Sequence, residues 1–253
     1  MVSPTELRLP QRHVEHCMGT VFSIDVRAPG VDHSAIESIV RWLHWVDEVF
    51  STYKPSSQIR RLELGDLSID DCAPEVREIL TRCEELTIET NGYFTAYADG
   101  ALDPSGLVKG WAIQRASETL TAAGSINHCV NGGGDIQCAG SAKPGQPWRI
   151  GITDPLRPGE FAGVIAGHNL AVATSGTAER GSHIHSPDGY DAVAGLTSVT
   201  VVGTQLSTVD AYATAAFAMG SAARGWIESL PDYYGLISYA DGSRWSSASF
   251  ASS

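Results

Sequence analysis

The hydrophobic pattern of this chain changes partway along it, and that change limits the folds that the chain can adopt. Before residue 124, apolar residues recur mainly at the three- and four-residue steps of amphipathic helices, as between Ile36 and Phe50. Beyond residue 124 most apolar segments are short, and the run LTSVTVV at 196–202 reads most clearly as a strand. Because helices and strands do not alternate strictly, the pattern favours an α+β fold over a doubly wound parallel sheet.

Local signals place the individual elements. Pro74 near a first helical turn, and Gly124 just past a helix end, mark two of the boundaries. Helices are expected over 34–50, 73–91, 105–123, 209–219 and 222–230. Strands are expected over 20–26, 128–130, 148–153, 163–166, 170–174, 196–202 and 235–239, with a short hairpin turn at 241–242.

Charge and composition exclude several classes of function. The 253 residues carry 17 Lys and Arg against 29 Asp and Glu, a net charge of −12, which argues against nucleic-acid binding. No apolar run approaches the roughly 20 residues that a membrane helix needs. The N-terminus lacks the basic start and apolar stretch of a secretory signal, so a cytoplasmic location is expected. The five cysteines form no CxxC pair, so free thiols are expected rather than zinc ligands or disulfides.

Two glycine-containing segments are candidates for ligand binding. In DPSGLVKGWAIQRA, Gly106 and Gly110 lie four apart on one side of a helix, and Asp103 stands at a capping position. The amides of that first turn would suit an anion, although a capped helix packed through its glycines is the commoner explanation of such spacing. In NGGGDIQCAG, the glycines allow close backbone approach to a ligand or only a sharp turn, and Asp135 would orient a ligand hydroxyl or amide.

Two further segments carry hydroxyl, carboxylate and imidazole groups. In ATSGTAERGSHIHSP, His183 and His185 would share one face of a strand, which suits part of a zinc or iron site or, for a single imidazole, a general base. In STVDAYATAAFAMG, Asp210 and Thr214 lie one helical turn apart and offer hard oxygen ligands for Mg²⁺ or Ca²⁺. The alternative for the second segment is a polar notch in a buried helix.

These segments, in this order, resemble the ApbE family of flavin transferases. The resemblance runs from about Met18 to Gly220 and rests on eight anchors, among them MGT, FSTYKPSSQIRRL, GYF, AVATSG and SHIHSP besides the segments above. It implies a compact α+β domain over 1–253, with an antiparallel sheet packed by helices. It also implies that FAD and Mg²⁺ are bound, that FMN is moved to a Ser or Thr hydroxyl of an acceptor flavoprotein, and that AMP leaves.

The resemblance also implies roles for single residues. His183 would be the base that takes the proton of the acceptor hydroxyl, and Gly106, through its carbonyl, would hold the metal with Asp210 and Thr214. The flavin and adenine-diphosphate pocket would be lined by Met18, Tyr53, Phe94, Asp103 and Lys109, and completed by Asn131, Gly133, Asp135, Thr174 and Ser175.

The chain departs from the family pattern in three places. Thr95 stands where an Asp is usual, only nine positions separate Phe94 from Asp103 where a longer segment is common, and HIHSP replaces HIxDP, which adds His185. Three other activities compete with transfer to a protein. They are FAD hydrolysis to FMN and AMP in the same site, flavin binding without turnover, and zinc hydrolysis at His183 and His185.

Overall fold

The fold is built on one antiparallel sheet of eight strands. The computed structural model describes residues 11–27, 31–98, 100–177 and 195–247. The strand order is β1-β2-β5-β6-β9-β10-β11-β12, and every neighbouring pair is antiparallel. The strands are β1 Gln11–Cys17, β2 Thr20–Val26, β5 His128–Gly132, β6 Asp135–Ala139, β9 Ala171–Gly176, β10 Leu196–Gly203, β11 Tyr234–Tyr239 and β12 Arg244–Ser246.

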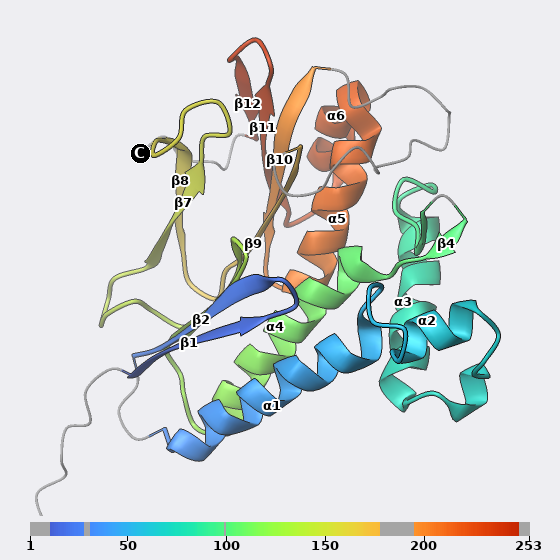
Figure 1. The fold of residues 1–253 in the computed structure, drawn as a ribbon. Coiled ribbons are helices and arrows are strands. Elements are labelled where there is room, and N and C mark those ends of the chain that lie inside the picture. Colours follow the sequence, from blue (N-terminus) through green and yellow to red (C-terminus); the bar gives the residue numbers. More distant parts are fainter. Residues whose placement is uncertain (1–10, 28–30, 99, 178–194, 248–253) are drawn as a thin grey trace, which may run out of the picture.

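Helices cover one face of this sheet (Figure 1). Two of them, α4 and α5, pack against each other and against strands β5, β6, β9 and β10, while α1 packs along α4. The helices are α1 His33–Phe50, α2 Gln58–Glu63, α3 Pro74–Glu89, α4 Ser105–Ala122, α5 Leu206–Met219 and α6 Ala223–Ser229, with short 3₁₀ turns at Ile69–Asp71 and Gly220–Ala222.

Two small hairpins complete the described structure. Strands β3 Tyr97–Ala98 and β4 Ala101–Leu102 form one, and β7 Trp148–Thr153 and β8 Phe161–Gly167 form the other. The β7–β8 hairpin lies on the side of the main sheet opposite the helices (Figure 1). It encloses a second, smaller core, which contains Cys138, Trp148, Ile150, Ile165, Leu170, Val172 and Val202.

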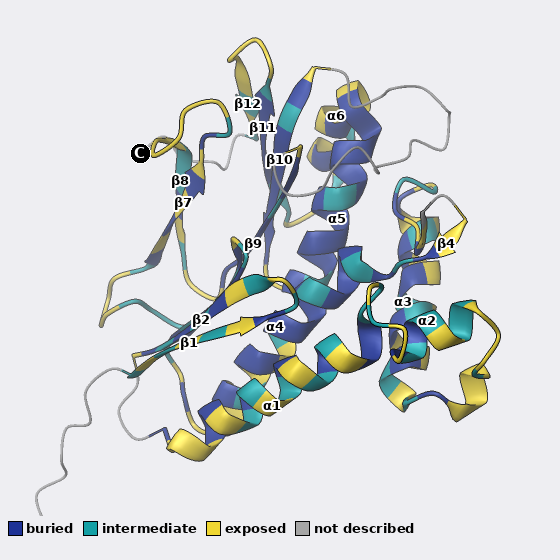
Figure 2. Ribbon diagram, viewed as in Figure 1, coloured by how far each residue is buried: buried dark blue, intermediate teal, exposed yellow. Residues whose placement is uncertain are grey.

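Helix α5 lies in the middle of the main core, and Figure 2 shows it dark blue over most of its length. Twelve of its residues are buried, and its alanines keep it slim enough to fit between α4 and the sheet. A helix enclosed on all sides needs apolar residues all round, and this requirement explains the alanine-rich sequence. Asp210 is buried in this helix, so it needs polar partners inside the core.

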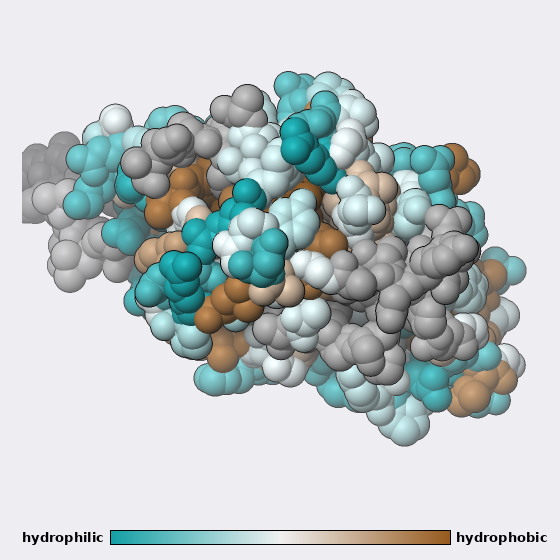
Figure 3. Space-filling view, turned by 90° about the horizontal axis from the view of Figure 1, so that it is seen from above, coloured by the Kyte–Doolittle hydropathy of each residue, from teal (hydrophilic) through white to brown (hydrophobic). Residues whose placement is uncertain are grey.

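The surface is mixed in polarity. Seen from above, hydrophobic residues form separate patches among hydrophilic ones (Figure 3), in keeping with the net charge of −12. Within the described ranges, no helix is long and apolar enough to cross a membrane.

The α+β class and the antiparallel sheet predicted from the sequence are confirmed, and most expected elements are present within three residues of their limits. The five cysteines are free thiols, as expected. Strands β1, β3, β4 and β6, helix α2 and the 3₁₀ turn at Ile69–Asp71 were not predicted. Strand β6 turns its polar residues Asp135 and Gln137 toward the main core. Apolar residues usually take such buried positions, so the sequence pattern does not indicate a strand here.

Gln137 is buried because it caps α5. Its Oε1 accepts from the Leu206 amide at 2.9 Å, and its Nε2 donates to the Thr204 carbonyl at 3.1 Å. The residue before the helix, Gln205, makes no capping bond of its own. Gln137→Ala should therefore lower the free energy of unfolding by about 1–3 kcal/mol, because a buried amide loses its acceptor. Chemical denaturation would measure this, and Gln114→Ala, which removes a partly buried contact to Ser207, should cost less.

Candidate functional site

The N-terminal turn of α4 is shaped by Asp103 and Gly106. Pro104 is the N-cap residue of α4 and makes no side-chain capping bond. Asp103 stands one position earlier, and its Oδ1 accepts from the Ser105 amide at 2.9 Å. Gly106 is buried in the first turn. Asp103 therefore closes a short turn that leads into the helix and is not its N-cap residue, which differs from the expected capping position.

Helices α4 and α5 cross at Gly110, and this crossing ties Asp210 to α4. A Cβ at Gly110 would lie 2.7 Å from both the Asp210 Cβ and the Leu206 carbonyl oxygen, so only glycine fits here. The Gly110 amide donates to Asp210 Oδ2 at 2.9 Å. In a regular helix that amide would donate to the carbonyl of Gly106, four residues earlier. The Asp210 carboxylate therefore competes with the Gly106 carbonyl for one hydrogen-bond donor.

A second buried carboxylate, Asp135 at the start of β6, lies close to Asp210. Only 1% of its side chain is exposed, its Oδ2 is 2.5 Å from Lys109 Nζ, and its Oδ1 accepts from the Thr174 amide at 3.1 Å. Burial and the charge of Asp210 raise the pKa of Asp135, while Lys109 lowers it. Two buried carboxylates beside one ammonium group form an environment that favours an additional positive charge.

Hydroxyl groups extend this cluster along α5. Thr214 lies one turn after Asp210, and its Oγ1 is 3.3 Å from Ser175 Oγ on β9. Thr174, next to Ser175, differs from it: its hydroxyl contacts Thr200 Oγ1 at 2.9 Å, and only its amide reaches Asp135. The structure thus brings Ser175 and Thr214 together, while the Thr174 side chain faces the cross-strand neighbour Thr200.

Two tight turns lie beside each other near this cluster. Met18 and Gly19, with φ of 50° and 68°, join β1 to β2, and Gly133 and Gly134, with φ of 64° and 101°, join β5 to β6. A Cβ at Gly133 would lie 2.8 Å from Thr20 Oγ1, so the two turns touch. Positive φ is uncommon for a residue such as Met18 and marks a position where function often imposes the conformation.

Asn131 supports the second of these turns from the last part of β5. Its Oδ1 accepts from the Gly134 amide at 3.0 Å, which closes the loop over the glycines. Its strand partner in the sheet is Ser23 on one side and Ile136 on the other. The predicted pocket residues Asn131, Gly133 and Asp135 therefore belong to a single hairpin tip.

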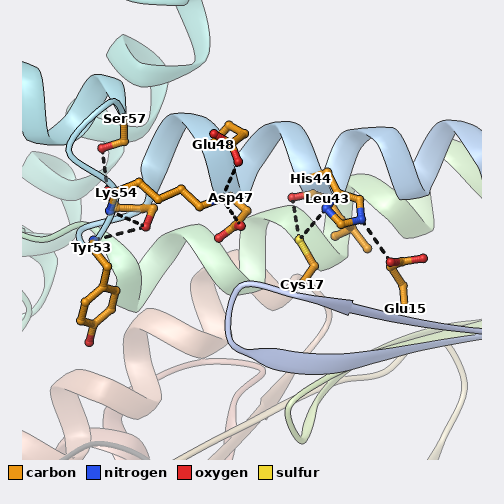
Figure 4. Close-up of polar contacts among 10 residues, drawn as sticks. Glu15, Cys17, Leu43, His44, Asp47, Glu48, Tyr53, Lys54 and Ser57 are labelled. Atoms are coloured by element: carbon orange, nitrogen blue, oxygen red, sulfur yellow. Dashed lines mark hydrogen bonds and ion pairs between the residues drawn. The ribbon is translucent and has the colours of Figure 1, made fainter.

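Tyr53 extends from a loop that polar contacts hold against the end of α1 (Figure 4). The amides of Tyr53 and Lys54 both donate to Ser51 Oγ at 3.2 Å, and Lys54 Nζ pairs with Asp47 at 2.6 Å and Glu48 at 2.5 Å. The Tyr53 residue is 94% exposed, and its ring points away from α1. A ring held in this way is available to stack on a flat ligand.

Phe94 is placed differently from the expectation. It is 1% exposed and belongs to the main core, and its amide donates to Thr90 Oγ1 at 2.9 Å. Its side chain therefore packs inside the main core, and it is not exposed at the surface. The predicted base His183 and its neighbour His185 lie outside the described residues.

A metal centre of imidazole or thiolate type is not found in the part of the chain that the structure describes, because no three His, Cys, Asp or Glu side chains group suitably there. The groups near Asp210 that could bind a metal are carboxylate and hydroxyl oxygens. Of the two readings of Gly110, close helix packing is the one that the structure shows, whereas the closeness of Asp135 to Asp210 was missed. The Gly-x-x-x-Gly spacing carried a signal for the first, whereas the second depends on β6, whose strand character was hidden.

An antiparallel sheet covered on one face by crossed helices makes this an α+β protein. The ApbE family profile matches residues 18–100 and 95–237, which is most of the chain, and the chain belongs to the ApbE family.

Individual relatives agree with this assignment. The FAD:protein FMN transferase of Vibrio cholerae is 32% identical over 154 residues, which are 57% of this chain and 46% of the relative. The protein of the same name from Rhodobacter capsulatus is 35% identical over 122 residues, 45% of this chain and 23% of the relative. The alignments thus span less than half the length of these two relatives.

Solved structures share the fold. The ApbE protein of Thermotoga maritima has a TM-score of 0.80 at 23% identity, over 95% of this chain and 98% of that one. The flavin transferase ApbE of Vibrio cholerae also has a TM-score of 0.80, at 22% identity and the same coverage. At these identities the likeness concerns the arrangement of helices and strands.

Proposed function

We propose that this chain is an FAD:protein FMN transferase, which moves the FMN part of FAD to a Ser or Thr hydroxyl of an acceptor flavoprotein and releases AMP. The relatives described above, which are FAD:protein FMN transferases, support the reaction class. In this chain, the main support for the proposal is the hydrogen bond that the Gly110 amide on α4 donates to the Asp210 carboxylate on α5. In a regular helix, that amide would donate only within α4.

The donors at this link fit a hard divalent cation such as Mg²⁺. The Gly106 carbonyl shares its usual donor with Asp210, the Asp210 carboxylate is buried, and the Thr214 hydroxyl lies one turn further on. A carbonyl, a carboxylate and a hydroxyl are the oxygen ligands that Mg²⁺ accepts. Bound there, Mg²⁺ would neutralise the charge of a pyrophosphate and polarise its phosphorus.

The remaining residues have roles that follow from their positions. Lys109, held by Asp135, presents its ammonium group where phosphate oxygens would need a counter-charge. Tyr53 offers an exposed ring for stacking, and the turns at Met18 and Gly133 bring backbone close to a ligand. His183 stays our prediction for the base that takes the proton of the acceptor hydroxyl.

One incubation tests the reaction class. The protein is mixed with FAD and Mg²⁺, with and without a flavoprotein acceptor bearing a Thr in an accessible loop, and the products are separated by chromatography. We expect AMP to appear only with the acceptor, together with flavin fixed to it through a phosphoester. AMP and free FMN without acceptor would replace the proposal by FAD hydrolysis. If FAD binds and no AMP forms with any of a panel of acceptors, a flavin-binding protein without turnover takes its place.

A further inference from the structure

Two cysteines face each other across neighbouring strands, outside the candidate site. Cys129 on β5 and Cys138 on β6 are direct partners in the antiparallel register. Their sulfur atoms are 3.2 Å apart, and the Cys138 thiol donates a hydrogen bond to Cys129 Sγ. Both are free thiols in this structure. The other three cysteines, Cys17, Cys72 and Cys83, have no thiol among their described hydrogen-bond partners.

The register places this pair where a cross-strand disulfide fits. The turn between β5 and β6 has two residues of positive φ, Gly133 and Gly134, as in a type I′ hairpin. Hydrogen-bonded pairs then alternate with open pairs from Gly132–Asp135 onward, and Cys129–Cys138 falls on an open pair. Open pairs have Cα atoms about 4.5 Å apart, within the span that a disulfide bridges. The sulfurs need to approach by only about 1 Å to reach bonding distance.

The two thiols differ in burial, so they suit different steps of a thiol–disulfide exchange. Cys138 is 1% exposed in the second core, to which Trp148 also belongs, and the hydrogen bond to Cys129 together with burial raises its pKa strongly. Cys129 is half-buried, so it is the sulfur that a reagent from solvent reaches first. The pair therefore has one accessible thiol and one protected thiol that lies ready beside it.

We propose that Cys129 and Cys138 form a redox-active dithiol that a soluble disulfide, such as oxidised glutathione, converts into a cross-strand disulfide. The Cys129 thiolate attacks one sulfur of oxidised glutathione, which forms a mixed disulfide and releases one glutathione thiolate. The Cys138 sulfur then attacks Cys129 Sγ, and its proton goes to the second glutathione thiolate as this leaves. Two protein thiols are oxidised, and one glutathione disulfide is reduced to two thiols. This proposal is independent of the proposed function.

The reaction is tested by mapping thiols on the intact, folded protein. Reduced protein is incubated with oxidised glutathione without oxygen, free thiols are alkylated, and the chain is cleaved before Asp135 to separate the two cysteines. We expect the five thiols to fall to three, and the peptides of Cys129 and Cys138 to be joined until a reductant is added. Retention of all five thiols, or a bridge between other cysteines, overturns the proposal.

Single variants distinguish the thiol that attacks glutathione disulfide from the thiol that closes the bridge. Cys138→Ser should accumulate glutathione on Cys129, because no resolving thiol remains, whereas Cys129→Ser should take up neither glutathione nor a bridge. Cys72→Ser is the matched control, because it removes a buried thiol elsewhere and should leave the bridge intact. Thermal unfolding of each variant shows that it is folded. Absence of glutathione from Cys129 in folded Cys138→Ser protein contradicts the assigned order of attack.

Discussion

Asp210→Asn should reduce flavin transfer by at least about a hundredfold while FAD binding changes by less than about tenfold. The Asn side chain keeps an oxygen that accepts from the Gly110 amide, so the crossing of α4 and α5 is preserved, and only the charge is lost. Under the proposed function, that charge would hold a divalent cation, which would supply most of its stabilisation in the transition state, where negative charge increases on the phosphate oxygens. Steady-state kinetics at several Mg²⁺ concentrations and FAD titration by flavin fluorescence measure the two quantities.

Asp154→Asn is the matched control for this experiment. Asp154 is also a buried carboxylate, 3% exposed, but it pairs with Arg244 and joins the β7–β8 hairpin to β12, away from the crossing. Its replacement should lower stability and leave turnover per folded molecule within about twofold. Equal losses of FAD binding and turnover in Asp210→Asn would show that Asp210 does not act through a catalytic metal.

The protein should lose about 3 kcal/mol of stability between pH 6.5 and pH 4 through a single histidine, His128. This residue is fully buried, with its ring nitrogens 2.7 Å from Ser117 Oγ and 3.0 Å from Ser125 Oγ. Burial lowers the pKa of His128 to about 4. The unfolded chain therefore binds a proton below pH 6.5 that the folded chain refuses, so the contribution is complete above pH 6.5 and declines as the pH falls toward 4.

This effect is measured by comparing the denaturation curves of the wild type and of a variant at a series of pH values. His128→Gln removes the titrating ring, so its stability should depend less on pH than that of the wild type across this window. His168→Gln removes a surface histidine that contacts Ser141 at 3.0 Å, and it should leave the pH dependence unchanged. If the His128→Gln and wild-type curves run parallel from pH 6.5 to 4, another group is responsible for the acid sensitivity.

The sequence predicts the helices of this fold well because their apolar stripes record which face is buried. Helix α1 was placed within one residue at its start and at its end, and α4 likewise. The strand that carries Asp135 was not predicted, because the side chains that it turns toward the main core are a carboxylate and an amide whose partners come from distant segments. Periodicity reports burial of apolar groups and cannot report burial of satisfied polar ones.

The part of the candidate site that lies on one helix was predictable from the sequence. Asp210 and Thr214 share a helix, so their spacing shows that they face the same way. The contact of Asp135 with Lys109 joins a strand to a helix, and no spacing rule relates residues on different elements. Phe94 shows the opposite difficulty, because a family position that is aromatic was expected at the ligand, and the structure uses it as core.

The contact between Gly110 and Asp210 joins residues that are 100 positions apart in the chain. During synthesis the ribosome must therefore complete α5 before α4 has a partner at its crossing point. The strands that flank the cluster are also separated in sequence, since β6 pairs with β9. Contacts of such long range slow folding, because a long stretch of chain must be ordered before they can form. A nascent chain that ends before residue 206 thus lacks Asp210 and Thr214, and the crossing of α4 and α5 cannot form until translation of the C-terminal fifth of the protein is under way.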